Sequence, residues 1–249
     1  AADNDLPGTD KAIGFDTARE IATQAIDRLH TTATATHRIM IVELMGLHAG
    51  WLTLGAGLAA GADVILIPEF PYDMKLVVNA ILDRKRAGRN FSLVAVAENA
   101  RSQELVDFVE RAARLKAQRE AEGTQEVDQE VERISSSYSG ETMLLARRLR
   151  EETGLETRIT ILGSLVRGGT PTAADRLLAT QLAEWSALMV VNGQFGRMAR
   201  RLNDQMGSVP LEEVVDRHKV IPPDHAWIRG AYQVGTCLGV VPPITVPLL

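Results

Sequence analysis

Apolar and polar positions alternate with two different spacings along this chain. Apolar residues recur at intervals of three and four over residues 14–29, which predicts an amphipathic helix, and we expect the threonine-rich run of residues 31–36 to end it. Continuous apolar runs, typical of buried strands, then occur at three places. They cover residues 38–44, 63–69 and 91–97, and helices are predicted between them, one ending at residue 60 and one over residues 72–86.

This order of elements predicts the α/β class, with a mainly parallel sheet that helices cover on both faces. The second half of the chain continues less regularly. The charged stretch of residues 101–135 has a thin apolar stripe, so we interpret it as a solvated helix or helical hairpin rather than a binding surface. The remaining predicted elements are a helix over 141–153 ended by Gly154, a strand over 156–162, a helix over 172–191, a short strand or two, and helices over 210–216 and 226–234.

Composition narrows the possible functions. The chain has 249 residues, of which 45% are hydrophobic and 24% are charged, so it can bury a sizeable core. No apolar run is long enough to span a bilayer and no signal-like segment is present, so we expect a cytoplasmic protein with no membrane partner. The formal net charge of −5 argues against nucleic-acid binding and favours a small anionic ligand held by arginines. Cys237 is the single cysteine, which excludes an intrachain disulfide, and we place it in the core on the last helix.

Three carboxylates gather on a Pro-Gly turn near the start of the sequence. Asp3 and Asp5 lie two residues apart, so one can act as a general base while the other orients it or holds a metal ion. Aspartates also cap helices and form turns, and the spacing alone favours that structural role. His37 and His48 lack the spacing of a metal-binding pair, so no zinc site is assigned. Because a catalytic turn normally follows a strand, we expect further sequence upstream of Ala1.

Several polar residues follow predicted strands. Met45, Gly46, Glu69 and Glu98 all come at or just after strand ends. Ligands of parallel sheets bind at the carboxyl ends of the strands, so we expect most of these residues on one rim with Asp3. A glutamate on that rim either accepts hydrogen bonds from sugar hydroxyls or is simply solvated.

Three arginines lie beside predicted strands and suggest an anion site. Arg38 and Arg158 begin strands, and Arg167 precedes Gly168-Gly169 and a helix. Backbone N–H groups in such a glycine segment can wrap a phosphate, and the planar fork of arginine suits the same group. Ordinary surface ion pairs are the alternative role for these arginines.

Several short motifs occur together in the order found in one enzyme family. They are the Asp-Asn-Asp of residues 3–5 with the helix start at 13–18, and the segments at 42–46, 67–69, 95–98, 156–158 and 162–169. In this order they resemble phosphofructokinases over nearly the whole chain, up to about residue 235. The Pro-Pro-Asp-His of residues 222–225 is similar to the branch that uses ATP or pyrophosphate.

The resemblance implies phosphoryl transfer to the 1-hydroxyl of fructose 6-phosphate, giving fructose 1,6-bisphosphate in glycolysis, with ATP or pyrophosphate as donor and Mg²⁺ beside it. It also implies a homodimer or homotetramer in which Arg38 reaches a neighbouring site. Asp3 would be the general base, Asp5 would support the magnesium-bound phosphate, and Arg167 would bind substrate and transition-state charge. The implied substrate-binding positions are Ala1, Arg38, Met45, Gly46, Leu47, Glu98, Arg158, Ser164 and Arg167, with Arg38 and Arg158 on the 6-phosphate.

The same resemblance divides the chain between two domains. Residues 15–165 would bind fructose 6-phosphate, whereas residues 1–14 and 166–220 would belong to a donor-binding domain, followed by a C-terminal helix and tail over 221–249. The first part of the family's sequence, with its glycine-rich donor loop, is not in this chain. We therefore expect residues 1–14 and 166–220 to expose apolar surface.

Four places depart from the family pattern, one of them Ala35-Thr36, where the family has Ser-His. Ala1 stands in place of a threonine, Leu47 in place of an arginine, and Ser164 in place of a histidine or tyrosine. Losing a group that stabilises transition-state charge costs about 10²–10³ in rate. These departures leave open a non-catalytic sugar-phosphate-binding or regulatory member of the family. An unrelated sugar-phosphate isomerase is a further alternative.

Overall fold

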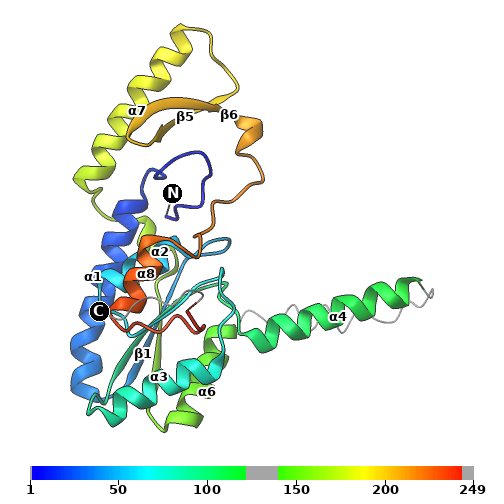
Figure 1. Cartoon of the computed structure of the whole chain (residues 1–249). Coiled ribbons are helices and arrows are strands. Elements are labelled where there is room, and N and C mark those ends of the chain that lie inside the picture. Colours follow the sequence, from blue (N-terminus) through cyan, green and yellow to red (C-terminus); the bar gives the residue numbers. More distant parts are fainter. Residues whose placement is uncertain (1, 122–139, 243–249) are drawn as a thin grey trace.

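The computed structural model describes residues 2–121 and 140–242 (Figure 1). In the helix over residues 103–121, side chains are described as far as residue 114. Ala1, residues 122–135 of the charged stretch and residues 243–249 of the predicted tail lie outside the described residues. In chain order the elements are α1 (Phe15–Thr36), β1 (Ile39–Leu44), α2 (Trp51–Ala59), β2 (Val64–Leu66), α3 (Met74–Arg86), β3 (Ser92–Ala97), α4 (Gln103–Ala121), α6 (Glu141–Thr153), β4 (Thr157–Ile161), the 3₁₀ helix η2 (Gly163–Arg167), α7 (Ala173–Val191), β5 (Arg197–Leu202), β6 (Gln205–Pro210), the 3₁₀ helix η3 (Leu211–Glu213) and α8 (Ala226–Gln233).

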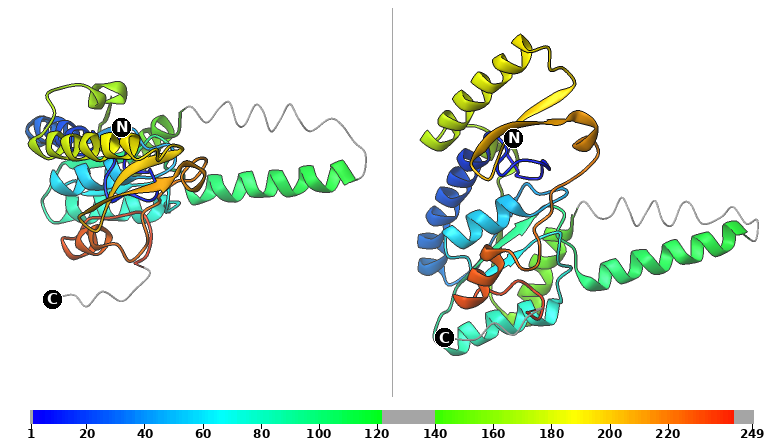
Figure 2. Two further views of the ribbon diagram at one scale, coloured as in Figure 1. Left: turned by 90° about the horizontal axis from the view of Figure 1, so that it is seen from above. Right: turned by 45° about the horizontal axis from the view of Figure 1, so that its top comes forward.

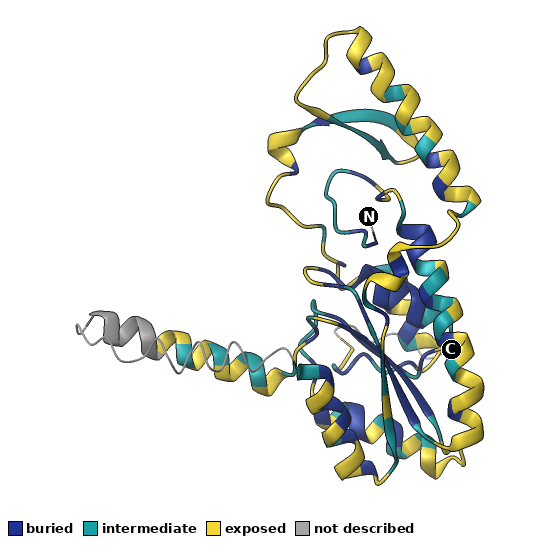
Figure 3. Cartoon of the chain, turned by 180° about the vertical axis from the view of Figure 1, so that it is seen from behind, coloured by how far each residue is buried: buried dark blue, intermediate teal, exposed yellow. Residues whose placement is uncertain are grey.

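Strands β1 to β4 form one parallel sheet in the order β2-β3-β1-β4. Side chains alternate between its faces, as the period of a strand requires. Ile39 and Ile41 of β1 join the core beneath α3 and α6, whereas Met40 and Val42 join the core beneath α1, α2 and α8. The central strands are buried on both faces, and the predicted α/β class is confirmed (Figures 1 and 3).

The threonine-rich run does not end α1, contrary to the sequence prediction. The hydroxyl groups of Thr34 and Thr36 donate to carbonyl oxygens one turn back, at 2.9 and 2.7 Å, so these side chains are satisfied within the helix. Ala33 in the same turn is fully buried and attaches it to the core. The helix ends only at His37, whose N–H donates to the carbonyl of Ala33 and whose left-handed backbone (φ 53°) turns the chain so that the N–H of Arg38 reaches the same carbonyl at 3.4 Å.

Two other predictions near the C-terminus are wrong in detail. The helix predicted over residues 210–216 is only the short turn η3, because Pro210 is still paired with β5 and Asp216 adopts a left-handed φ of 57°. Cys237 lies beyond α8 rather than on it. It forms a short parallel bridge with Val64 that widens the sheet, and there it packs partly buried against the core.

A second, smaller layer faces the carboxyl edge of the sheet. It consists of α7 and the antiparallel β5–β6 hairpin, and the N-terminal segment runs between this layer and the sheet (Figures 1 and 2). Helix α4 projects away from the rest of the chain (Figure 2). None of the described helices combines the length and apolar character that a membrane span needs. Several apolar side chains on α7 and the loop after it are 48–82% exposed, namely Leu177, Leu188, Val190, Val191 and Phe195.

Candidate functional site

A cleft of about 770 Å³ lies where the carboxyl ends of β1 and β3 face the start of α7. Segments far apart in the sequence line it: the acidic turn, the loop after β1, the end of β3, η2, and the first turns of α1 and α7. The predicted residues Asp3, Asp5, Met45, Gly46, Leu47, Glu98 and Arg167 are all among the lining, together with Ala2, Ile13, Gly14, Thr17, Val166, Gly168, Gly169, Pro171, Asp175, Arg176 and Ala179.

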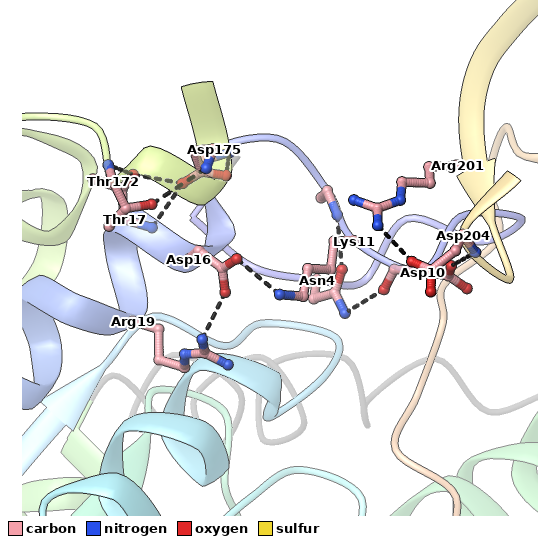
Figure 4. Close-up of polar contacts among 12 residues, drawn as sticks. Asn4, Asp10, Lys11, Asp16, Thr17, Arg19, Thr172, Asp175, Arg201 and Asp204 are labelled. Atoms are coloured by element: carbon pink, nitrogen blue, oxygen red, sulfur yellow. Dashed lines mark hydrogen bonds and ion pairs between the residues drawn. The ribbon is translucent and has the colours of Figure 1, made fainter. Parts of the chain in front are cut away.

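The acidic turn, residues 2–12, is held by hydrogen bonds to other segments (Figure 4). Asn4 is buried inside it, where its side-chain oxygen accepts the N–H of Ala12 at 2.8 Å. On one side the N–H of Asp10 donates to the carbonyl of Arg201 in β5 at 2.8 Å. On the other side the ammonium of Lys219 donates to the carbonyl of Asp10 at 3.0 Å, and burial lowers the pKa of this lysine to about 8.

Asp3 is the carboxyl in the cleft whose ionisation is most changed by its surroundings. Its pKa is raised to about 7, chiefly by burial and in smaller part by the neighbouring carboxylates of Asp5 and Glu69. The backbone N–H groups of Asn4 and Leu52 act in the opposite direction, because they stabilise the charged form. Leu52 lies in the first turn of α2, so the carboxyl faces a helix N-terminus. A carboxyl that titrates near pH 7 can accept a proton at physiological pH.

Arg167 enters the cleft from the end of η2, and two glycines follow it. Gly169 has a φ of 83°, and a Cβ there would lie 2.8 Å from the Cδ1 atom of Ile21 in α1. Any other residue would therefore be strained by its backbone and would meet α1. The glycine lets the chain cross α1 closely, so that Arg167 and the first turn of α7 share one wall of the cleft.

The loop after β1 and the end of β3 form another wall. A Cβ on Gly46 would lie 3.0 Å from the Cβ of Ala97, so the two strand ends approach closely here. The N–H of Glu98 donates to the carbonyl of Leu44 at 2.9 Å, which fixes the start of the loop that carries this glutamate. Leu47 is 56% exposed and brings no charge to this wall.

Arg38 and Arg158 do not line the cleft. Arg38 precedes β1, and Arg158 in β4 pairs with Met40 near the start of β1, so both lie at the amino edge of the parallel sheet. The carboxylate of Glu156 joins them, at 2.7 Å from Arg38 and 2.5 Å from Arg158. The expectation that three arginines meet at one anion is therefore not met within a single chain, because the two ends of parallel strands lie at opposite edges.

Two other predicted residues, Ser164 and Glu69, are not part of the cleft lining. Ser164 belongs to η2 but is not among the lining residues. Glu69 accepts the N–H of Gly50 at 3.1 Å and that of Ile221 at 3.0 Å, so it ties the start of α2 to the C-terminal segment. Ala1 lies outside the described residues.

The structure adds residues that the sequence analysis did not select. Thr17, Asp175 and Arg176 line the cleft, although Thr17 and Asp175 are 158 positions apart and no local pattern links them. A partial signal was available, because Thr172 followed three residues later by Asp175 is typical of a helix start.

Histidines approach the acidic turn without forming a metal cluster. His48 and His218 stack with ring centroids 3.7 Å apart, and Nδ1 of His218 lies 3.4 Å from the carboxylate of Asp5. Among the residues that the structure describes, no group of three or more His, Cys, Asp or Glu side chains could hold a metal ion.

Comparison with known proteins decides the family. The sequence profile described as Phosphofructokinase matches residues 1–190. The chain belongs to the phosphofructokinase family. It is 49% identical over 243 residues to an ATP-dependent 6-phosphofructokinase of Propionibacterium freudenreichii subsp. shermanii, and 44% identical over 237 residues to one of Spirochaeta thermophila. Each match covers 95% of this chain, but only 64% and 60% of the two relatives.

The fold agrees with this assignment. The solved phosphofructokinase of Saccharomyces cerevisiae is similar with a TM-score of 0.66 and 30% identity, over 86% of this chain and 25% of that one. The family resemblance drawn from the sequence motifs is therefore confirmed, as is the fold class. The roles of the individual cleft residues in this phosphofructokinase-family chain stay predictions.

The raised pKa of Asp3 predicts a pH-dependent effect of Asp3→Asn on stability. Because the folded-state pKa of about 7 lies above the ordinary value of 3.8, the folded protein holds an extra proton between these pH values. The stability of wild type relative to the variant is therefore greatest near pH 4 and falls as pH rises through 7. At pH 8 we expect the variant Asp3→Asn to be more stable than wild type, with a free energy of unfolding about 1–3 kcal/mol higher.

Urea unfolding at pH 4.5, 6 and 8 measures this effect, with the exposed Asp27→Asn on α1 as the matched control. A difference between Asp3→Asn and wild type that stays constant over this range would contradict the raised pKa.

Proposed function

We propose that this chain carries the sugar-phosphate side of a 6-phosphofructokinase, which transfers a phosphoryl group to the 1-hydroxyl of fructose 6-phosphate. The observation that carries this proposal is that Asp3, Glu98 and Arg167 line one cleft at the carboxyl edge of the sheet. Phosphoryl transfer to a sugar requires a base, a group that accepts hydrogen bonds from the sugar hydroxyls, and a guanidinium or similar cation. Asp3, Glu98 and Arg167 can fill these three roles in that order. The chain spans about three fifths of the length of its curated relatives, so the complete reaction is part of the proposal.

In the proposed reaction, the 1-hydroxyl oxygen forms a bond to the terminal phosphorus of the donor while the bond to the donor's leaving oxygen breaks. Asp3 takes the proton of that hydroxyl, and its raised pKa suits this exchange at neutral pH. Arg167 stabilises negative charge on the transferred group. Glu98, Met45 and the backbone at Gly46 bind and orient the sugar, and η2 with the start of α7 forms the facing side of the cleft.

We propose ATP as the donor, since the curated relatives at 44–49% identity are named ATP-dependent, with pyrophosphate as the alternative. Mg²⁺ fits as a partner of the donor rather than as a resident ion, because the described cleft residues provide the carboxylates of Asp3 and Asp5 but no group of three ligands. When bound with the donor, it neutralises phosphate charge, with Asp5 beside it. A cytoplasmic location, without membrane or nucleic-acid partners, stays a prediction.

The positions of Arg38 and Arg158 support a symmetric homodimer or homotetramer. Both guanidinium groups lie on the same amino edge with Glu156, away from the cleft of their own chain. They can serve a sugar phosphate only if this edge meets the cleft of a second copy. We therefore assign the 6-phosphate of the sugar to Arg38 and Arg158 of a neighbouring subunit.

The role of Asp3 as base can be tested by activity in a joined protein. This joined protein consists of the chain fused to the part of the Propionibacterium relative that lies outside the match. We expect Asp3→Asn to lower kcat by about 10²–10⁴, because the variant cannot take the proton, with little change in KM. A coupled assay of fructose 1,6-bisphosphate formation measures this, with Asp27→Asn as control. Full activity of Asp3→Asn would refute the proposed reaction and favour a different sugar-phosphate enzyme.

A subunit-mixing experiment tests the shared site. Asp3→Asn and Arg38→Gln should each impair the joined protein, the first in kcat and the second mainly in KM for fructose 6-phosphate. When the two variants are unfolded together and refolded, mixed dimers contain one site with both native residues. We expect up to about a quarter of wild-type activity, from the statistics of random pairing. Mixtures no more active than the separate variants would place Arg38 outside the neighbouring site.

One observation favours the second candidate, a non-catalytic sugar-phosphate-binding member of the family. Leu47 leaves the wall after β1 without the arginine that the family pattern has there. If the chain is catalytic, Leu47→Arg should raise kcat by about 10²-fold or less, since it restores one transition-state charge. Calorimetric binding of fructose 6-phosphate without turnover, in both wild type and Leu47→Arg, would favour the non-catalytic function.

A further inference from the structure

A closed set of hydrogen bonds joins the starts of two helices beside the cleft (Figure 4). Asp175 in the first turn of α7 accepts the N–H of Gly14 at 2.9 Å with one oxygen. Its other oxygen accepts the N–H of Thr17 at 2.7 Å and the hydroxyl of Thr17 at 2.5 Å. The hydroxyl of Thr17 in turn accepts the N–H of Thr172, and the hydroxyl of Thr172 accepts the N–H of Asp175.

This arrangement supplies α1 with a cap that its own sequence lacks. The N-cap residue of α1 is Gly14, which has no side chain to accept the free N–H groups of the first turn. Asp175 accepts two of them from a position 161 residues later. It is only 5% exposed, and its two oxygens together accept three protein donors. Most of its acceptor capacity is therefore used within the protein, and its effect on the cleft passes through the residues that it holds.

The two helix starts are also the ends of the two segments that carry the proposed chemistry. The acidic turn with Asp3 runs into α1, and the segment with Arg167 and Gly169 runs into α7. The relative position of the base and the guanidinium is thus set where these helices meet. The 3₁₀ helix that carries Arg167 contacts α1 as well.

A series of short contacts connects this meeting point to Asp3. Asp175 accepts the N–H of Gly14. Phe15, which follows Gly14, donates its N–H to the carbonyl of Ala12 at 3.2 Å. The N–H of Ala12 donates to the side chain of Asn4 at 2.8 Å, and the N–H of Asn4 donates to the carboxylate of Asp3 at 2.8 Å. A displacement of the start of α1 is therefore transmitted along hydrogen-bonded groups to the base.

We propose that Asp175 is a positioning residue for phosphoryl transfer, which fixes the start of α1 to the start of α7 so that Asp3 and Arg167 face the same bound sugar phosphate. This inference rests on the proposed function for its catalytic part, and on the geometry of the helix starts alone for its structural part. In this proposal the buried carboxylate of Asp175 aligns the side chains of Asp3 and Arg167 without contacting either of them.

Asp175→Asn tests the proposal with little change of shape. Asparagine places an NH₂ group where one carboxylate oxygen accepted donors, so it cannot satisfy both Gly14 and the two donors of Thr17. In the joined protein we expect kcat per folded molecule to fall about 10²-fold, the cost of a displacement near 1 Å. The affinity for fructose 6-phosphate should change less than about threefold, because the sugar-binding wall is intact.

A double-mutant cycle with Asp3→Asn separates positioning from general structural damage. If Asp175 acts through Asp3, then Asp175→Asn should change kcat less than about threefold in the Asp3→Asn background. The control is Asp73→Ala, which removes the carboxylate that caps α3, away from the cleft lining. This variant also loses a helix cap, but its kcat per folded molecule should stay at the wild-type value.

Hydrogen exchange of the chain itself gives a readout that needs no turnover. In Asp175→Asn we expect the N–H groups of Asn4 and Ala12, which do not contact Asp175, to exchange about tenfold faster than in wild type. Those groups should exchange at the wild-type rate in Asp73→Ala. Unchanged exchange of Asn4 and Ala12 would overturn the proposal, as would an equal loss of kcat with and without Asp3. If wild type transfers no phosphoryl group, the proposed function fails and the exchange result alone decides the positioning role.

Discussion

The acidic turn, residues 2–12, has no helix or strand of its own, and the arrangement of the cleft depends on the hydrogen bonds that hold it in place. The carbonyl of Arg201 and the ammonium of Lys219 fix it from two sides, and the buried side chain of Asn4 closes it from within. These partners come from parts of the chain about two hundred residues away. The base of the proposed reaction is therefore positioned by tertiary contacts, whereas the wall proposed to bind the sugar is positioned by the sheet.

Burial gives the same turn its chemical character. A solvated aspartate loses its proton near pH 4, whereas Asp3 titrates near pH 7 because its charge is removed from water and lies close to other carboxylates. The helix N-terminus at Leu52 limits this effect, so the carboxyl stays able to lose its proton at physiological pH. The cleft thus combines a weak base with the guanidinium of Arg167, and the absence of a charge at Leu47 is its clearest departure from the family pattern.

The second arginine group follows a different physical rule. In a parallel sheet, residues before the strands and residues after them lie at opposite edges, so Arg38 and Arg158 cannot reach the cleft of their own chain. The pairing of both with Glu156 also lowers the pKa of that carboxyl and keeps the three side chains together. A symmetric contact between copies would bring this edge to a second cleft without any change in the fold.

The amino-acid sequence by itself determined the α/β class, the parallel sheet, most element boundaries and the family, because these follow from local periodicity and from short motifs in a fixed order. It also selected Asp3, Glu98 and Arg167, which lie at strand or turn ends where ligands bind. Only the tertiary structure decided that α1 continues through its threonines, since the burial of Ala33 outweighs a weak local preference. The tertiary structure also decided that Asp175 caps a distant helix and that two of the three arginines lie at the far edge. A sequence pattern shows only spacing along the chain. The cap on α1 depends on a distant carboxylate that reaches its buried N–H groups, and the position of the two arginines depends on which end of a strand each one occupies.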